Sequence, residues 1–580
     1  MDFVSQIALF IAEKTDLARE EVQNYIEVPA QQEMGDFALP CFRLAKTMRR
    51  APQQIAADLS EQLRPLPDFI ERVEAVGGFL NFSINRAVRI KNTLSMILDE
   101  SHQPGSSDVG GKKTVIVEYS SPNIAKPFHI GHGFTTILGE SLARIYARQG
   151  YDVVRFNHLG DYGTQFGKLI VAIDLWVDEE RLKNEPITEL LRVYVKFHEE
   201  AKREETDHDG VSQLEIRARE AFRNLENGEP HELRLWQTIR DLSLEEFSRV
   251  YDRLGIHFDN LNGESFYSSR IPDVVALLNE RHLLEQSEGA QVVRLDEYDL
   301  PPCIILKSDG TTIYASRDLA AVLYRDEEYR FEKNIYVVGI PQTMHFKQVF
   351  SVLDKAGCDC AKRCVHVPFG TVKFPDRKLS TREGDVIKLE DLLNEAVAKT
   401  REIIAKNASQ RGEDMSNEEI DEIAEKVGLG AVVYLFLRNG RERDIVFRWE
   451  EVLDFEGDTA PYLQYTYARA RSILRRAKDE IQDDMIAYQR IDSDSVYQVV
   501  VALDGFADSV ADACEANEPY IIARQIHLIA RQFNKFYNNE HILNEQDEEL
   551  RRGRLAVCQC VCRILKVGLE LLGIEAVEKM

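Results

Sequence analysis

The chain has 580 residues, of which 44% are hydrophobic and 9% aromatic, an ordinary composition for a globular protein. No stretch approaches the roughly 18 uncharged apolar residues that cross a bilayer, so we expect no membrane partner. The net charge of −26 argues against a nucleic-acid partner unless basic residues are concentrated in one region.

The N-terminal segment MDFVSQIALFIAEKTD predicts an amphipathic helix and lacks the basic region and cleavage site of a signal peptide. The nine cysteines are odd in number and scattered, so a disulfide framework is not expected. These features predict a cytoplasmic protein.

Two cysteine clusters need separate interpretations. One is CDCAKRCVHV, whose spacing matches no common zinc site and whose second half alternates like a strand. Zinc is therefore not expected there. Whether Cys358, Cys360, Cys364 and His366 bind a metal stays open. The other comprises Cys558, Cys560 and Cys562 in a helical run, where core packing is the better interpretation.

The first predicted elements form an α+β region followed by a β-loop-α-β unit. Residues 1–105 mix helical patterns with the strand-like GGFLNFSIN. KTVIVEYS then fits a buried parallel strand, HGFTTILGESLARIYARQG a helix that ends at Gly150, and DVVRFNHLGDYG a second strand. This succession predicts a doubly wound, Rossmann-like α/β domain with a parallel sheet over residues 106–390.

The remaining elements are mostly helical. A charged helical pattern from about 174 to 260 indicates an insertion, after which PCIILKSDGTTIYASRDLAAVL and KNIYVVGIPQTMHF supply strands followed by helices. Beyond residue 390 we expect a helical connection over 391–455 and an all-α domain over 456–580. Residues 459–478 contain five bases and no acid. Arg471, Arg475 and Lys478 share a helical face by their spacing, which suits either a polyanion or a solvated surface.

The loop NIAKPFHIGHG is the best candidate for handling a nucleotide. GSSDVGGKKT has the glycine spacing of a P-loop, but Gly111 stands where the lysine belongs and the segment precedes its strand. His129 and His132 instead lie where a helix begins, and its unpaired N–H groups and partial positive charge suit a phosphate. Gly131 allows close approach, and the imidazoles can donate to oxygens that gain charge in a transition state. The alternative is that both histidines only cap the helix.

These motifs identify a resemblance. HIGH resembles the first nucleotide-binding motif of class I aminoacyl-tRNA synthetases, and RKLSTREG resembles their lysine-serine loop, with Lys378 and Ser380 in the expected places. Thr381 stands where a second lysine is usual, a departure typical of many arginyl-tRNA synthetases, in which a lysine upstream of the histidine motif, here Lys126, is thought to compensate. EYSSPNIAKPFHIGH, NHLGDYGTQFG, GDFALPCFRLAK and RLAVCQCVCRILKVGLELLGI also resemble that family, so the resemblance covers nearly the whole chain.

The resemblance implies an enzyme that activates L-arginine with Mg²⁺-bound ATP and transfers arginine from the adenylate to the 3′-terminal ribose of tRNA(Arg), without a permanent cofactor. The catalytic residues it implies are Lys126, His129, His132, Lys378 and Ser380, and the ATP-binding ones are His129, Gly131, His132 and Lys378. The arginine-binding positions it implies are Ser121, Asn123, His132, Tyr314, Asp318 and Gln342, with Glu118 and Glu264 as further acidic candidates. The fork of N–H donors of a guanidinium matches the two oxygens of a carboxylate. Asp318 is the first candidate to bind the guanidinium, and Glu264 is the second.

The resemblance also implies a tRNA partner for the outer domains. The C-terminal helices resemble an anticodon-binding domain, and residues 1–105 an additional domain that contacts the tRNA elbow. ARQFNKFYNNE interleaves rings and bases, which suits stacking on unpaired bases, although core packing of each ring is the alternative. The candidate tRNA contacts are Arg469, Arg471, Arg475, Arg531, Phe533, Lys535 and Tyr537. A monomer is the family expectation; a synthetase for glutamine, glutamate or cysteine, and an RNA-binding regulator without activity, are the alternatives.

Overall fold

A computed structural model describes residues 3–29, 31, 34–207, 212–308, 313–374, 387–411, 415–477 and 481–580. The chain forms two compact units. The smaller comprises residues 1–103, 470–505 and 529–563, and the larger comprises residues 104–469, 506–528 and 564–580.

A four-stranded parallel sheet lies in the larger unit, in the order β10-β9-β4-β5. Its strands are β4 (Thr114–Glu118), β5 (Asp152–Phe156), β9 (Lys333–Gly339) and β10 (Cys364–Phe369). The chain forms β4 and β5 first and then crosses to the other side of β4 to form β9, so the strand order reverses between β4 and β9. In open α/β sheets, ligands bind beside the carboxyl ends of the strands at such a reversal.

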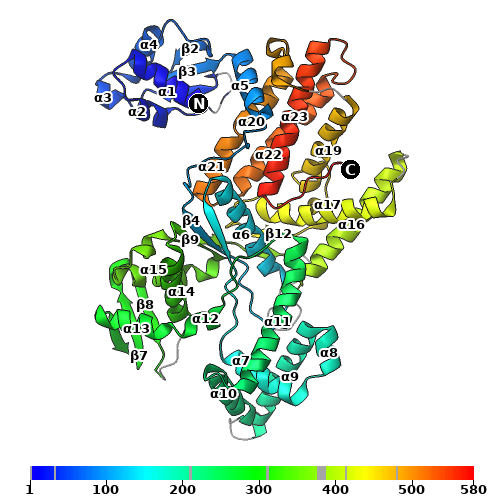
Figure 1. The fold of residues 1–580 in the computed structure, drawn as a ribbon. Coiled ribbons are helices and arrows are strands. Elements are labelled where there is room, and N and C mark those ends of the chain that lie inside the picture. The colour runs from blue at the N-terminus through cyan, green and yellow to red at the C-terminus, as the bar shows by residue number, and fades with distance from the viewer. Residues whose placement is uncertain are drawn as a thin grey trace. The chain divides into compact units, whose positions relative to one another are not determined.

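Helices cover both faces of this sheet (Figure 1). Helix α6 (Ile130–Arg148) contacts β4, β5 and β9, whereas α14 (Tyr314–Tyr329) and α15 (Thr343–Lys355) share an apolar core with Ile116 and Tyr336. Because both faces are covered, the middle of β4 reads as an unbroken apolar run. The predicted doubly wound parallel sheet is confirmed. Helix α6 starts at Ile130, slightly before the predicted position, because His129 caps it.

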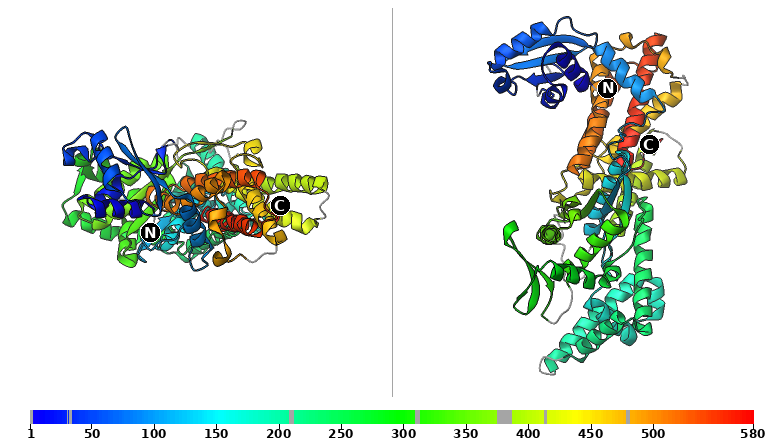
Figure 2. Two further views of the ribbon diagram at one scale, coloured as in Figure 1. Left: turned by 90° about the horizontal axis from the view of Figure 1, so that it is seen from above. Right: turned by 60° about the vertical axis from the view of Figure 1, so that its left-hand side comes forward.

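The remaining parts of the larger unit flank this core. A three-stranded antiparallel sheet precedes α14, with α12 and α13 before it. The helices of the insertion pack on one another as a bundle, in which α7, α9, α10 and α11 make mutual contacts (Figure 2). The bounds of these elements are β6 (Leu284–Ser287), β7 (Ala290–Leu295), β8 (Leu300–Leu306), α7 (Thr164–Trp176), α8 (Glu179–Asn184), α9 (Pro186–Asp207), α10 (Gln213–Glu226), α11 (Pro230–Arg253), α12 (Glu264–Ser268) and α13 (Ile271–Glu280).

The predicted helical character after residue 390 also holds, apart from the short strand β12 (Ile445–Val446), which pairs in parallel with β11 (Val372–Lys373). The helices are α16 (Leu389–Arg411), α17 (Asn417–Leu437), α18 (Trp449–Val452), α19 (Ala460–Ala477), α20 (Asp494–Asp504), α21 (Phe506–Ala516), α22 (Tyr520–Asn539) and α23 (Glu548–Leu571). Cys558, Cys560 and Cys562 are buried in α23, which confirms their assignment to the core.

The N-terminal part of the smaller unit has the predicted α+β character. Its antiparallel sheet has the order β1-β3-β2, and buried side chains such as Ile7, Ile55 and Phe82 form a core between sheet and helices. The elements are α1 (Phe3–Lys14), α2 (Arg19–Tyr25), β1 (Phe37–Pro40), α3 (Ala45–Met48), α4 (Pro52–Gln62), β2 (Ile70–Val76), β3 (Phe79–Ile84) and α5 (Arg86–Leu98).

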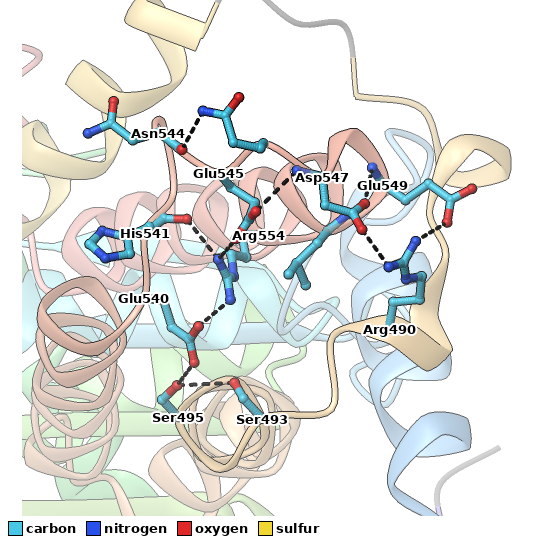
Figure 3. Close-up of polar contacts among 12 residues, drawn as sticks. Arg490, Ser493, Ser495, Glu540, His541, Asn544, Glu545, Asp547, Glu549 and Arg554 are labelled. Atoms are coloured by element: carbon cyan, nitrogen blue, oxygen red, sulfur yellow. Dashed lines mark hydrogen bonds and ion pairs between the residues drawn. The ribbon is translucent and has the colours of Figure 1, made fainter.

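Ion pairs fix the segment between α22 and α23 in the smaller unit (Figure 3). Arg554 donates to Glu540, to Glu545 Oε2 at 2.8 Å and to the carbonyl oxygen of His541 at 2.8 Å. The hydroxyl of Ser495 donates to Glu540 Oε1 at 2.7 Å. The Arg554 and Glu540 side chains are only 11% and 13% exposed. This cluster therefore keeps two carboxylates in a largely buried position next to a single guanidinium.

Replacing Arg554 with methionine is expected to destabilise this unit by about 3–5 kcal/mol, because the buried carboxylates lose their partner. Arg490→Met is the matched control: Arg490 pairs with Asp547 at 2.5 Å and Glu549 at 2.8 Å, but it is 48% exposed. That change should cost clearly less than the loss of Arg554, because an ion pair exposed to solvent contributes little to stability. Urea unfolding of both full-length variants measures the difference, and equal losses would contradict the assignment of Arg554 to the buried cluster.

Candidate active site

The loop between β4 and α6 ends in two stacked imidazoles. The ring centroids of His129 and His132 lie 3.8 Å apart with an interplanar angle of 20°. The N–H of Gly131 donates to Nδ1 of His129 at 3.1 Å, and the N–H of His129 donates to Nδ1 of His132 at 3.3 Å. Because each Nδ1 accepts, the proton of each neutral ring sits on Nε2. Both rings are therefore oriented as Nε2–H donors.

Burial lowers the pKa of both imidazoles. For His132, burial together with the charges of His129 and Lys126 lowers the pKa to about 3. The pKa of His129 is also lowered, mainly by burial. Both rings are neutral at physiological pH, so the positive charge at this helix N-terminus comes from the exposed Lys126 and from the helix dipole.

Gly131 has a structural role beyond allowing a ligand to approach. A Cβ at this position would lie 2.9 Å from Cε1 of His129. A side chain here would therefore displace the imidazole from its stacked position, so the glycine is required by the geometry of the histidine pair.

Three carboxylates gather beside the carboxyl edge of the sheet. Asp161 follows β5, Glu264 begins α12, and Asp318 lies in the second turn of α14; the charges of Asp161 and Asp318 both act on Glu264. Asp161 accepts the N–H of Ser265 at 2.9 Å and its hydroxyl at 2.7 Å. Sequence reasoning missed Asp161, although its position near the end of the predicted strand segment DVVRFNHLGDYG was a usable signal.

Each of the two acids predicted for a guanidinium has a basic partner in the chain. Nε2 of His345 lies 2.5 Å from Oδ2 of Asp318, and Arg317 forms an ion pair with Glu264. Burial raises the pKa of Asp318, but the hydrogen bond and charge of His345 outweigh burial and leave it below its ordinary value. Conversely, burial lowers the pKa of His345, and Asp318 more than compensates. We expect this pair to be ionic.

Glu118, at the end of β4, pairs with the fully buried Arg325 across 2.6 Å. Any substrate contact of Glu118 would have to share its carboxylate with Arg325, and its role as an arginine ligand stays a prediction. Ser121 lies in the loop after β4 with a left-handed backbone (φ 46°), and its N–H donates to Oδ1 of Asn157 at 3.1 Å.

The other residues predicted to bind arginine surround the same edge. Asn123 is exposed in the β4–α6 loop, Tyr314 is exposed at the first position of α14, and Gln342 is exposed at the end of the short 3-10 helix (Ile340–Gln342) that follows β9. The elements that carry these residues all start or end at the carboxyl edge of the sheet, which is where the strand order reverses.

Lys378 and Ser380, predicted to act with the histidines, lie outside the described residues. The chain that follows them is described from Ile387, whose carbonyl oxygen accepts the N–H of Ile130 at 3.2 Å. The N–H of Leu389 donates to the carbonyl oxygen of Phe128 at 2.9 Å. The segment after the lysine-serine motif is thus hydrogen-bonded to the histidine loop.

Two observations concern metals and membranes. Within the described ranges, no group of three or more His, Cys, Asp or Glu side chains is arranged to hold a metal ion. His366, in the cysteine-rich segment, lies on β10 with its Nε2 2.9 Å from the carbonyl oxygen of Val338.

Among the helices that the structure describes, none is long and apolar enough to cross a bilayer.

The residues predicted to contact tRNA differ in exposure. Arg475 on α19 and Arg531, Lys535 and Tyr537 on α22 are exposed, and Arg471 is partly exposed. Arg469, in the larger unit, places its guanidinium carbon 4.8 Å from the ring centroid of Tyr465. Phe533 needs correction: it is fully buried, so its ring packs in the helical core and offers no face for base stacking.

Comparisons with known proteins agree with this geometry. A doubly wound parallel sheet with a histidine pair at its first helix N-terminus is the arrangement of a class I aminoacyl-tRNA synthetase, and the family described as "tRNA synthetases class I (R), catalytic domain" matches residues 93–449. The family "Arginyl tRNA synthetase N terminal domain" matches residues 3–84, and "DALR anticodon binding domain" matches residues 463–580. The chain belongs to the arginyl-tRNA synthetase family.

Individual relatives extend over the full length. The arginine–tRNA ligases of Clostridium botulinum (strain Alaska E43) and Clostridium beijerinckii are each 49% identical to this chain, with complete coverage of both sequences. The arginyl-tRNA synthetase structure from Thermus thermophilus is 26% identical, has a TM-score of 0.82 and is covered completely. The one from Plasmodium falciparum, at 23% identity with a TM-score of 0.81 and coverage of 100% and 99%, shares the fold.

Proposed function

We propose that this chain ligates L-arginine to tRNA(Arg) in two steps. In the first, a carboxylate oxygen of arginine attacks the α-phosphorus of ATP, and the bond to the β-phosphate breaks, giving arginyl-adenylate and pyrophosphate. In the second, the 2′-hydroxyl of the 3′-terminal ribose attacks the arginyl carbonyl and AMP leaves. The observation that carries this proposal is that neutral Nε2–H donors for phosphate and partly buried carboxylates for a cation lie at one edge of the sheet.

The first step needs no strong general base, because its nucleophile is already an anion. Catalysis then depends on positioning and on neutralising phosphate charge. His129 and His132 donate from Nε2–H to phosphate oxygens, and Lys126 supplies a positive charge beside them. Lys378 and Ser380 are proposed to act on the same phosphates, and ATP enters as its Mg²⁺ complex.

Asp318 is proposed as the main ligand of the substrate's guanidinium. His345 holds Oδ2 of this carboxylate, and Oδ1 is the proposed acceptor. Glu264 adds a second negative charge, and the ring of Tyr314 flanks the aliphatic stem of the substrate. Ser121, Asn123 and Gln342 suit its α-ammonium and carboxylate groups. Such a site should reject citrulline by about 10⁴-fold or more, because buried acids would be left unpaired.

The outer domains are proposed to bind tRNA. Residues 1–105 contact its elbow and residues 456–580 its anticodon, with residues 391–455 connecting the latter to the catalytic domain at 106–390. The basic and aromatic contacts proposed are Arg469, Arg471, Arg475, Arg531, Lys535 and Tyr537. The monomeric state and the cytoplasmic location stay predictions.

ATP–pyrophosphate exchange with each amino acid, with and without tRNA(Arg), tests the proposed function. We expect exchange with arginine only, and only in the presence of tRNA, followed by esterification of arginine to that tRNA. Exchange stimulated by glutamine, glutamate or cysteine would assign another specificity, and RNA binding without exchange would support a regulator.

A further inference from the structure

A buried guanidinium of the chain itself lies beside the two acids proposed to bind arginine, Glu264 and Asp318. Arg317 immediately precedes Asp318 on α14, and its side chain is only 8% exposed. Its Nη1 donates to Glu264, and its guanidinium carbon lies 5.3 Å from the ring centroid of Tyr162 and 5.0 Å from that of Tyr314. An acid and two aromatic faces thus hold Arg317, which are the partners expected for a bound guanidinium.

The hydrogen bonding of Arg317 is incomplete. Its Nε is buried and has no hydrogen-bond partner among the residues that the structure describes. Leaving a buried donor unpaired is unfavourable, so a residue with only a packing role would more readily be an apolar side chain. What requires an explanation is therefore why the positive charge of Arg317 lies at this position.

The charges around Glu264 supply this explanation. Two other carboxylates lie near Glu264: Asp161, from the loop after β5, and Asp318, from α14. In the described ranges, Arg317 is the only cation at hydrogen-bonding distance from Glu264. Asp318 has His345 as its partner, and Asp161 has the more distant Arg240, 4.0 Å away. Removal of Arg317 would leave Glu264, whose side chain is only partly exposed, beside two other carboxylates, where the neutral acid is favoured.

We propose that Arg317 is a positioning residue for arginine selection: it keeps Glu264 ionised and fixed, so that Glu264 and Asp318 together attract one further guanidinium. This inference rests on the proposed function, because it assumes that arginine binds at Asp318. The alternative is that Arg317 only ties α12 to α14.

The pKa of Glu264 supports this role. Burial raises this pKa most, Asp318 and Asp161 raise it as well, and the charge and hydrogen bond of Arg317 lower it, which together leave it at about 7. Ionisation of Glu264 near neutral pH therefore depends on Arg317. Without that cation its pKa would rise, and Glu264 would be protonated at pH values where it is now ionised.

The test measures KM for arginine and for ATP in aminoacylation by the full-length chain between about pH 6.5 and 8.5. Arg317→Gln should raise the arginine KM about ten- to a hundredfold at neutral pH and change the ATP KM less than about twofold. The arginine KM of this variant should fall again toward pH 8.5 as Glu264 ionises. Arg317→Lys, which restores the charge, should return the arginine KM to within a few-fold of the parent chain.

A second arm does not depend on the folding of an Arg317 variant. In the parent chain, the arginine KM should rise as the pH falls below about 7, because Glu264 becomes protonated. Glu264→Gln should raise the arginine KM and remove this part of the pH dependence.

The outcomes separate the inference from the function. A parent chain that does not charge tRNA with arginine would overturn the proposed function. If the parent chain does charge tRNA with arginine, two results would overturn only the role of Arg317. One is that Arg317→Gln shifts the KM values for arginine and ATP equally. The other is that the arginine KM of the parent chain has no pH dependence that Glu264→Gln removes.

Discussion

Replacing Asp318 with asparagine is expected to raise the KM for arginine by roughly a hundredfold or more, with the KM for ATP changed less than about twofold. Truncating one partner of a buried, hydrogen-bonded charge pair typically costs about 2–5 kcal/mol. Asparagine keeps the shape of the side chain but removes the charge that would face the guanidinium. It also takes the anionic partner from His345, which lies 2.5 Å away. Steady-state aminoacylation with varied arginine and varied ATP measures both constants.

Glu327→Gln is the matched control for Asp318→Asn. Glu327 lies on the same helix but is exposed to solvent, so its neutralisation should leave both KM values unchanged. Equal increases of the arginine and ATP constants in the Asp318 variant would remove Asp318 from the guanidinium site and indicate a general disturbance of α14.

His132→Ala is expected to lower kcat for adenylate formation by about 10²- to 10³-fold, with little change in tRNA affinity. Removing one preorganised donor to a developing charge costs about 2.7–4 kcal/mol of barrier. Because burial lowers the pKa of His132 to about 3, the donor is a neutral Nε2–H, and no titration of this ring should appear in the pH–rate profile between about pH 6 and 8. Single-turnover kinetics with saturating ATP and tRNA measure the effect.

The control for His132→Ala is His231→Ala. His231 is an exposed histidine on α11 that contacts Asp174 and lies outside the proposed site. Its removal should leave kcat unchanged. A His132 variant with full turnover would mean that the imidazole serves only to accept the N–H of His129, and its loss would then appear as reduced stability alone.

The sequence was sufficient to predict the sheet and the histidine loop, because both depend on local patterns. The apolar run in β4 and the helix beginning at the histidine motif are properties of consecutive residues. The partners of the acids could not be found in this way. Arg317 is 53 residues from Glu264, and only the topology of the sheet brings the two together.

The prediction of Phe533 as a stacking ring failed for a different reason. Arg531 and Lys535 lie on the exposed face of α22, whereas Phe533 and Phe536 lie on its buried face. Alternation of rings and bases along the chain is what an amphipathic helix produces at its period of 3.6 residues. Tyr537, which is exposed, is the one aromatic residue of this segment that could stack on a base.

A crystal structure of the chain with a non-hydrolysable arginyl-adenylate analogue tests the central claim most directly. We expect the guanidinium of the analogue at Asp318, Arg317 still paired with Glu264, and the group that replaces the phosphate beside Nε2 of His129 and His132. An analogue bound away from this sheet edge, or one whose guanidinium faces solvent, would contradict the account.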